Sequence, residues 1–219
     1  MPQNLTTGHA HEVELEEALD FINTLELESG ELVDHLHKPD DAASWFLDHD
    51  LVHGTEARGW TADDLERVRQ VREALRDVID GVVEDRSPNP SSLAIVNEAL
   101  EGRRPARLEL DGSTIRIGHR HDASPVPNAL AVIAEAIVEE LASGRPDRFR
   151  ICANDRCRWA FYDESPTGRR RWCDMRTCGN RAKAARHRER AKAGAPDSPA
   201  PTGPTEAPDP AAIAPSRPN

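Results

Sequence analysis

The chain has 219 residues, a formal net charge of −11 at pH 7, 31% charged residues and 4% aromatic residues. This length allows one ordinary domain plus a small module, and the composition indicates a soluble protein with a mainly aliphatic core. No apolar run approaches the roughly 20 residues of a membrane span, and we recognise no secretory signal at the N-terminus. We therefore expect a cytoplasmic protein with no membrane partner, in which thiols stay reduced.

The predicted N-terminal elements are mainly helices. Apolar residues recur at helical spacing, and Thr61 is placed to cap the first free N–H groups of a long helix. The expected helices run over residues 11–27, from Asp40 to about His49, from Thr61 to about Val82, over Ser91–Leu100 and over 128–142. Between the last two, Asp111-Gly112 joins two alternating runs, which predicts a small β-hairpin within residues 106–121.

Every cysteine of the chain lies further along, as Cys152-x4-Cys157 and Cys173-x4-Cys178, with 15 residues between the two pairs. Clustered thiols in a reducing compartment indicate metal ligands rather than disulfides. Zn²⁺ binds four thiolates as a tetrahedron, which leaves no coordination position open for water. We therefore expect one structural zinc ion and no catalytic metal.

Short strands and one helix are expected around these cysteines. Residues 148–152 and 158–162 predict two strands that flank a knuckle, and a basic helix is predicted from Gly179 to about Ala193. Two thiolates from a knuckle and two near a helix N-terminus make a treble-clef-like arrangement, in which the helix dipole favours the thiolate form. The predicted fold class is α+β: a mainly helical N-terminal domain with a small β-hairpin, followed by a treble-clef-like Zn(Cys)4 finger.

Charge and proline content divide the chain. Residues 1–147 contain 13 Lys or Arg against 31 Asp or Glu, residues 148–193 contain 14 against five, and residues 194–219 contain one against three. The cysteine segment is therefore basic by +9 although the N-terminal segment carries −18. Eight prolines in the last 25 residues predict disorder. We expect a helical domain over 1–147, a finger over 148–193 and a disordered Pro-rich tail over 194–219.

The cysteine segment resembles the CGNR-type zinc finger, which is named for the string at residues 178–181. The matching pattern is Cys152-x4-Cys157-x3-Phe161-x-Asp163-x-Ser165, then Arg170-Arg-Trp-Cys173-x4-Cys178-Gly179-Asn180-Arg181-Ala-Lys183. The N-terminal region is similar to the ABATE domain that usually precedes this finger, through Leu19–Thr24 and the long helix over Leu65–Val82. The resemblance implies zinc, nucleic-acid binding and a role as a stress-induced transcription regulator in bacteria. It implies no particular ligand, operator or mechanism.

Basic residues of the finger are the candidates for contacts with nucleic acid, because phosphates attract clustered Lys and Arg. They are Arg169, Arg170, Arg171, Arg181, Lys183, Arg186, Arg188 and Arg190. The alternatives are a solvated loop for the arginine run, and for the helix either a solvated surface or docking on the acidic N-terminal domain. Trp159 and Trp172 either stack on bases or shield the sulfur atoms.

Polar residues on the first predicted helix are candidates for a ligand pocket. Asp20, Asn23 and Thr24 lie there among apolar neighbours. The alternative is that they are buried polar groups bonded to nearby backbone. Histidines at His35-x-His37 and His119-x-His121 lack a carboxylate or cysteine at metal-binding spacing, and we assign no metal to them.

The first functional hypothesis is a DNA-binding transcription regulator, nucleoid-associated when bound to DNA. Its N-terminal domain would sense a ligand or form a homodimer, and its zinc would hold the basic helix and the arginine run against DNA. The alternatives are a protein-interaction module, whose finger docks on an acidic partner or on its own N-terminal domain, and an RNA-binding protein. We find no catalytic motif and do not expect an enzyme.

Overall fold

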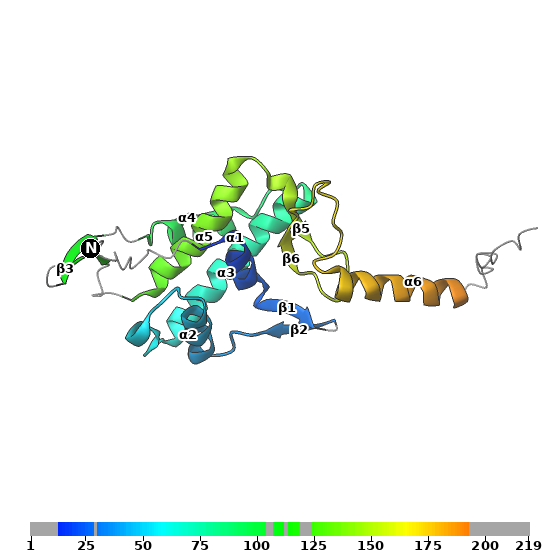
Figure 1. Ribbon diagram of the computed structural model, residues 1–219. Helices are drawn as coiled ribbons and strands as arrows, with labels where there is room; N and C mark the ends of the chain where they lie inside the picture. The colour runs from blue at the N-terminus through cyan, green and yellow to red at the C-terminus, as the bar shows by residue number, and fades with distance from the viewer. Residues whose placement is uncertain (1–12, 29, 104–106, 112–113, 119–123, 193–219) are drawn as a thin grey trace, which may run out of the picture. The chain divides into compact units, whose positions relative to one another are not determined.

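The computed structural model describes residues 13–28, 30–103, 107–111, 114–118 and 124–192. Within these ranges the helices are α1 (Leu15–Asn23), α2 (Pro39–Asp48), α3 (Ala62–Glu84), α4 (Pro90–Leu100), α5 (Val126–Ser143) and α6 (Asn180–Lys192). The strands pair as antiparallel hairpins: β1 (Leu25–Glu28) with β2 (Glu31–Asp34), β3 (Arg107–Asp111) with β4 (Thr114–Gly118), and β5 (Phe149–Ile151) with β6 (Ala160–Tyr162). A mainly helical N-terminal region with a small hairpin, followed by a hairpin and a helix around four cysteines, confirms the predicted class (Figure 1).

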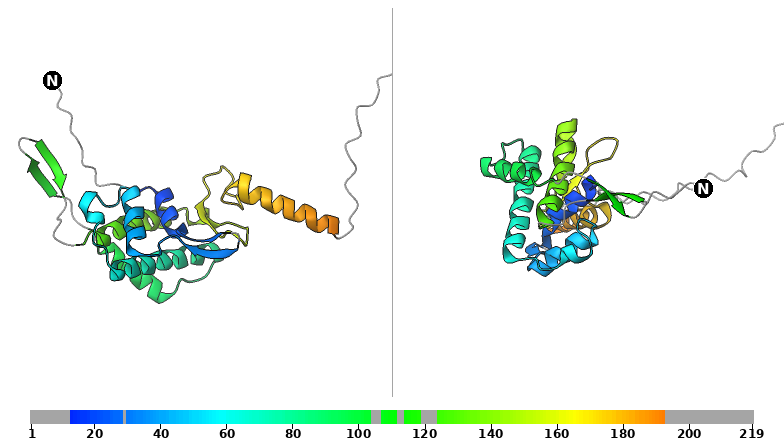
Figure 2. Two further views of the ribbon diagram at one scale, coloured as in Figure 1. Left: turned by 90° about the horizontal axis from the view of Figure 1, so that it is seen from below. Right: turned by 90° about the vertical axis from the view of Figure 1, so that its left-hand side faces the viewer.

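Helices α1, α3 and α5 lie against one another and form the centre of the core (Figures 1 and 2). Each contributes fully buried apolar side chains, such as Phe21 of α1, Leu75 of α3 and Ile133 of α5. Thr61 caps α3 as predicted, because its side chain accepts a hydrogen bond from the Asp64 N–H at 3.2 Å. Burial of such apolar faces is the main favourable contribution to folding, at about 25 cal/mol per Å².

The first predicted helix extends too far at its C-terminal end. Helix α1 ends at Asn23, where the Thr24 hydroxyl donates to the Phe21 carbonyl at 2.7 Å. The chain then enters β1, whose Leu-Glu-Leu-Glu alternation is the two-residue period of a strand. Pairing with β2 then places Leu25 opposite Asp34, and Leu27 opposite Leu32. The same alternation also fits a helical stripe over a few residues, which explains why residues 24–27 were assigned to the helix.

The other predicted elements differ from the structure mainly at their ends. Helix α4 begins at Pro90 rather than at a serine, because the Asn89 side chain caps it by accepting from the Ser91 N–H at 3.0 Å. The predicted hairpin at 106–121 is present as β3 and β4, with Arg107 opposite Gly118. Gly112 of its predicted turn and the predicted disordered tail lie outside the described residues.

The hairpin β5–β6 packs on the helical core. Phe149 and Ala160 are each 1% exposed and belong to the same apolar cluster as the helices, and β6 lies beside α1 while β5 lies beside α3. The first part of the finger is therefore built into the core, and the division at residue 147 stays a prediction. Helix α6, from Arg181 onward, belongs to a unit of its own. Among the described residues, no helix is long and apolar enough to cross a membrane.

Candidate metal centre and basic surface

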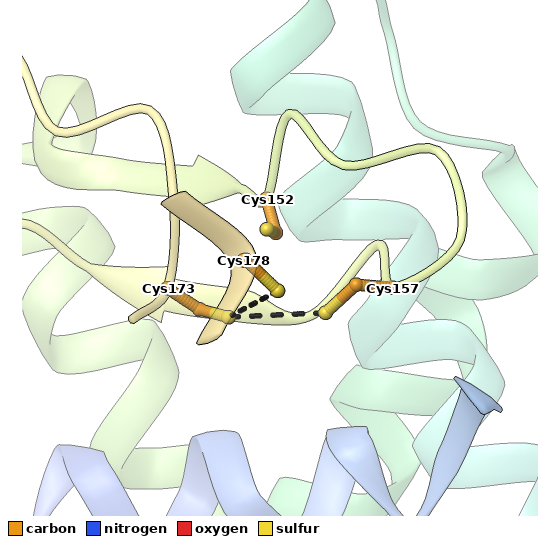
Figure 3. A group of neighbouring side chains, drawn as sticks. All are labelled: Cys152, Cys157, Cys173 and Cys178. Carbon is orange, nitrogen blue, oxygen red and sulfur yellow. Dashed lines mark hydrogen bonds between the residues drawn. The ribbon is translucent and has the colours of Figure 1, made fainter. Parts of the chain in front are cut away.

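The four cysteines meet at one point. Their sulfur atoms all lie within 4.8 Å of one another, and Figure 3 shows the sulfur ends converging. The Sγ atom of Cys173 lies 3.8 Å from that of Cys157 and 3.9 Å from that of Cys178. A regular tetrahedron with Zn–S bonds of about 2.3 Å has S–S edges of about 3.8 Å. The four-thiolate cluster therefore fits one zinc ion, with no position left for water.

Local backbone bonds bring each pair of cysteines to this point. At the end of β5, the Cys152 N–H donates to the Trp159 carbonyl at 2.8 Å, and the Cys157 N–H donates to the Asn154 carbonyl at 2.8 Å. Cys178 lies in a π-helical turn at Met175–Gly179, directly before α6. The Asp174 side chain caps that turn by accepting from the Thr177 N–H at 2.6 Å. Two thiolates thus come from a knuckle, Cys178 comes from the helical turn, and Cys173 directly precedes the Asp174 cap of that turn, so the second pair lies near a helix N-terminus as the sequence predicts.

Proton affinities in the cluster also favour a metal ion. A hydrogen bond from Cys173 lowers the pKa of the Cys152 thiol to about 5, against the opposing effect of burial. Burial, to which the Cys152 charge adds, raises the pKa of the Cys157 thiol to about 11. One thiolate therefore forms readily, and its charge helps to keep the Cys157 thiol protonated. A divalent cation offsets this repulsion and allows all four to ionise.

Aromatic side chains and one amide surround the sulfur atoms. Trp159, Trp172 and the buried Phe161 pack around the cysteines, which fits the shielding interpretation of the two tryptophans. The Asn154 amide donates to the Cys178 sulfur at 3.4 Å, a contact that the sequence gave no reason to expect. Asn180 donates to the Arg176 carbonyl at 2.9 Å, so its side chain bonds the backbone of the turn before α6.

Hydrogen bonds to the buried Asp163 and to the knuckle hold the backbone of the loop that carries the arginine run. Asp163 is fully buried and accepts hydrogen bonds from the N–H groups of Arg170 at 2.7 Å and Ser165 at 3.0 Å. Burial acts to raise the pKa of Asp163, but the bonds from Ser165 and Arg170 outweigh it and hold the pKa below its ordinary value. The Ala153 N–H donates to the Arg171 carbonyl at 2.7 Å, which ties the run to the knuckle.

The three arginines of the run differ in their contacts. Arg170 lies over the Phe161 ring at 5.0 Å and donates to the Cys173 carbonyl, so its side chain helps to close the loop. Arg171 is exposed and lies over the Trp172 ring at 5.2 Å. Arg169 is exposed and has no hydrogen bond or ion pair to any described residue. Arg169 and Arg171 are therefore the members of the run that remain available for a partner.

Helix α6, taken by itself, carries almost only small and basic residues. Its candidate side chains are exposed: Arg181, Lys183, Arg186, Arg188 and Arg190. Three of them, Lys183, Arg186 and Arg190, line one shallow groove together with His187. Positions i, i+3, i+4 and i+7 share one face of a helix, so these four side chains form a continuous basic stripe.

The three candidates for a ligand pocket have separate surroundings. Both polar atoms of the buried Asn23 amide bond the backbone of Ala160 in β6: the amide donates at 2.9 Å and its oxygen accepts at 2.8 Å. Thr24 bonds the Phe21 carbonyl and accepts from the buried Arg72 at 3.1 Å. Asp20 is exposed and lines a cavity of about 230 Å³. Asn23 therefore serves as a side-chain clamp on the finger hairpin.

His35 has carboxylate neighbours that the sequence spacing did not reveal. The hairpin β1–β2 brings the Glu26 carboxylate to 2.9 Å and the Glu28 carboxylate to 3.5 Å from His35 Nε2. These side chains are partly or largely exposed, and their hydrogen bond and ion pairs account for the arrangement. We assign no metal to them.

Comparison with known families agrees with this architecture. A family model for ABATE, described as "Putative stress-induced transcription regulator", matches residues 16–144. A model for the CGNR zinc finger matches residues 148–191, which include all four cysteines. A search of curated proteins found no match to the chain. Because the first model spans more than half of the sequence, the chain belongs to the ABATE family and carries a CGNR zinc finger after its ABATE domain.

Proposed function

We propose that the protein regulates transcription by binding DNA through its zinc finger. Family membership supports a role in transcription, and the basic surface supports DNA as the target. The observation that carries the proposal is the anchored loop at the metal centre. Buried Asp163 and the knuckle hold the backbone of the arginine run, while Arg169 and Arg171 remain exposed.

The zinc ion acts as a scaffold in this proposal. Its closed coordination shell leaves no site for substrate or water, so its contribution is to fix the Cys173 end of the arginine run and the turn that leads into α6. The stripe of Lys183, Arg186 and Arg190 adds phosphate contacts, and the small alanines of α6 allow close approach to a groove.

The test is a salt series of DNA affinity on the full chain loaded with zinc, because part of the finger is buried in the N-terminal core. Fluorescence anisotropy of a labelled duplex gives log K against log salt, with a slope of about −0.9 per phosphate contacted. Neutralising Arg169 and Arg171 together, or Arg186 and Arg190 together, should make the slope shallower by about 1.8 per pair. Arg58→Gln, an exposed arginine of the N-terminal region, is the control. Salt-independent binding, or slopes unaffected by both pairs, contradicts the proposal.

The charge partition supports a second candidate function. An acidic partner protein, or the acidic residues 1–147 of the same chain, would also attract the basic residues of the finger. In that case the Arg169 and Arg186 variants lose affinity for the acidic partner, and duplex DNA does not compete for it. RNA binding is distinguished in the same assay, by whether a single-stranded RNA displaces the duplex.

A further inference from the structure

A cavity of about 380 Å³ opens between the N-terminal region and the zinc knuckle. One wall is α3, a second is the hairpin β1–β2, and the end is closed by Cys157 and Arg158 of the knuckle. This volume lies within the range of small-molecule sites, about 300–1,000 Å³. Of the four cysteines of the metal cluster, only Cys157 lines this cavity.

The hairpin gives this cavity an apolar wall. Leu25, Leu27 and Leu32 all line it, and Leu27 lies directly opposite Leu32 in the strand pairing. Leu32 is 68% exposed, and Leu25 and Leu27 beside it are only partly buried, so the three form an exposed apolar surface. Water therefore contacts an apolar face that a ligand of matching size would cover.

The facing wall on α3 carries arginines that already form ion pairs with carboxylates. Arg72 is buried and donates to both Asp34 oxygens, at 2.7 and 2.8 Å. Arg76 donates to Asp80 at 2.9 Å and to the Arg158 carbonyl at 2.8 Å. The guanidinium of Arg158 lies 4.0 Å from carboxylate oxygens of Asp80 and Glu84.

One carboxylate on this wall has no such partner. Glu73 is exposed, lines the cavity and makes no hydrogen bond or ion pair with a described residue. Glu26, Asp77 and Asp80 also line it, but Asp77 pairs with Arg86 and Asp80 with Arg76, each at 2.9 Å, so Glu73 supplies the negative charge that these ion pairs leave unbalanced. The electrostatic environment of the cavity therefore favours a positive charge.

We propose that this cavity binds an organic cation with an apolar body, such as a substituted ammonium or phosphonium ion. The apolar part covers the three leucines and the cationic centre lies near Glu73. An anion of the same shape is disfavoured, because the guanidinium groups are held by carboxylates. The occupant would contact the knuckle at Cys157 and Arg158.

The experiment uses tetraphenylphosphonium and tetraphenylborate, which have the same shape and opposite charge. Each is titrated into the zinc-loaded full chain with ¹³C-methyl-labelled leucine, and the methyl resonances are followed by NMR. We expect the cation to shift Leu25, Leu27 and Leu32 in a saturable way and the anion to leave them in place. Anion-induced shifts that are confined to other leucines report binding outside the cavity.

Two variants and two matched controls locate the site. Glu73→Gln should weaken cation binding about two- to fivefold, as for a solvent-exposed ion pair, and Leu32→Ser about tenfold through lost apolar contact. Glu66→Gln on α3 and Leu93→Ser on α4 replace exposed residues outside the cavity and should change nothing. Unshifted leucines at saturating cation, equal affinity for the anion, or unchanged affinity in both cavity variants overturns the proposal.

Discussion

Replacing Asn23 with alanine removes the clamp between α1 and the finger hairpin. The variant leaves the N–H and carbonyl of Ala160 without partners, and Ala160 is only 1% exposed, so water cannot readily replace the lost bonds. A buried polar group that loses its partner costs about 1–3 kcal/mol. Two such groups give an expected loss of about 2–6 kcal/mol, a large share of a total stability of about 5–15 kcal/mol.

The assay is urea denaturation of the zinc-loaded full chain, followed by tryptophan fluorescence, together with the rate of zinc transfer to a chromophoric chelator. Since β6 leads directly from the knuckle, Asn23→Ala should lower the unfolding free energy and speed zinc transfer as well. Asn97→Ala, an exposed asparagine on α4, is the control and should stay within about 0.5 kcal/mol of the parent. A loss below about 0.5 kcal/mol in Asn23→Ala, or unchanged zinc transfer, would refute the clamp.

Three further changes have defined outcomes. Asp34→Asn should cost about 3 kcal/mol in urea denaturation, because the Arg72 guanidinium stays buried without its counter-charge. Burial acts to raise the pKa of Asp34, but the bonds from Arg72 hold that pKa below its ordinary value. The ionised Asp34 therefore stabilises the fold at pH values above its ordinary pKa, and this stabilisation is lost as pH falls through the lowered pKa. Asp34→Asn should accordingly lose less stability in acid than the parent does, and an equal loss in acid contradicts this. Cys173→Ser should abolish stoichiometric zinc binding by native mass spectrometry while circular dichroism retains the signal of the core helices; one tightly bound zinc in this variant counts against the four-thiolate site. Gly168→Ala places a Cβ 2.7 Å from Arg148 Nη1, which bonds the carbonyls that shape the arginine loop, so stability should fall by about 1–2 kcal/mol and DNA affinity with it; unchanged values for both would show that the loop is not held by Arg148.

Sequence patterns predict the helices and the metal ligands well because both are local. Thr61 with an apolar stripe behind it determines where α3 begins, and Cys-x4-Cys pairs bring sulfur atoms together within a short segment. The hairpin β1–β2 was missed because four alternating residues after α1 fit both periods, and the pairing with β2 depends on contacts across the turn.

Contacts between distant segments are what the sequence could not supply. Asn23 and Ala160 are 137 residues apart, and nothing in either local pattern indicates their two hydrogen bonds. The same holds for Asp34 and Arg72, which were not candidates for any site. The sequence does not distinguish the three arginines of the run. In the structure, Arg170 packs on Phe161, whereas Arg169 is exposed and contacts no aromatic ring of the described residues. Side-chain availability depends on packing and not on residue type.

The most direct test of the central claim compares DNA binding by the full chain with zinc and after chelation. If zinc holds the arginine run in place for phosphate contact, chelation should weaken affinity and make the slope of log K against log salt shallower by about 1.8, the share of Arg169 and Arg171. Equal affinity and equal slope with and without zinc would contradict the claim that the metal is the scaffold of a DNA-binding surface.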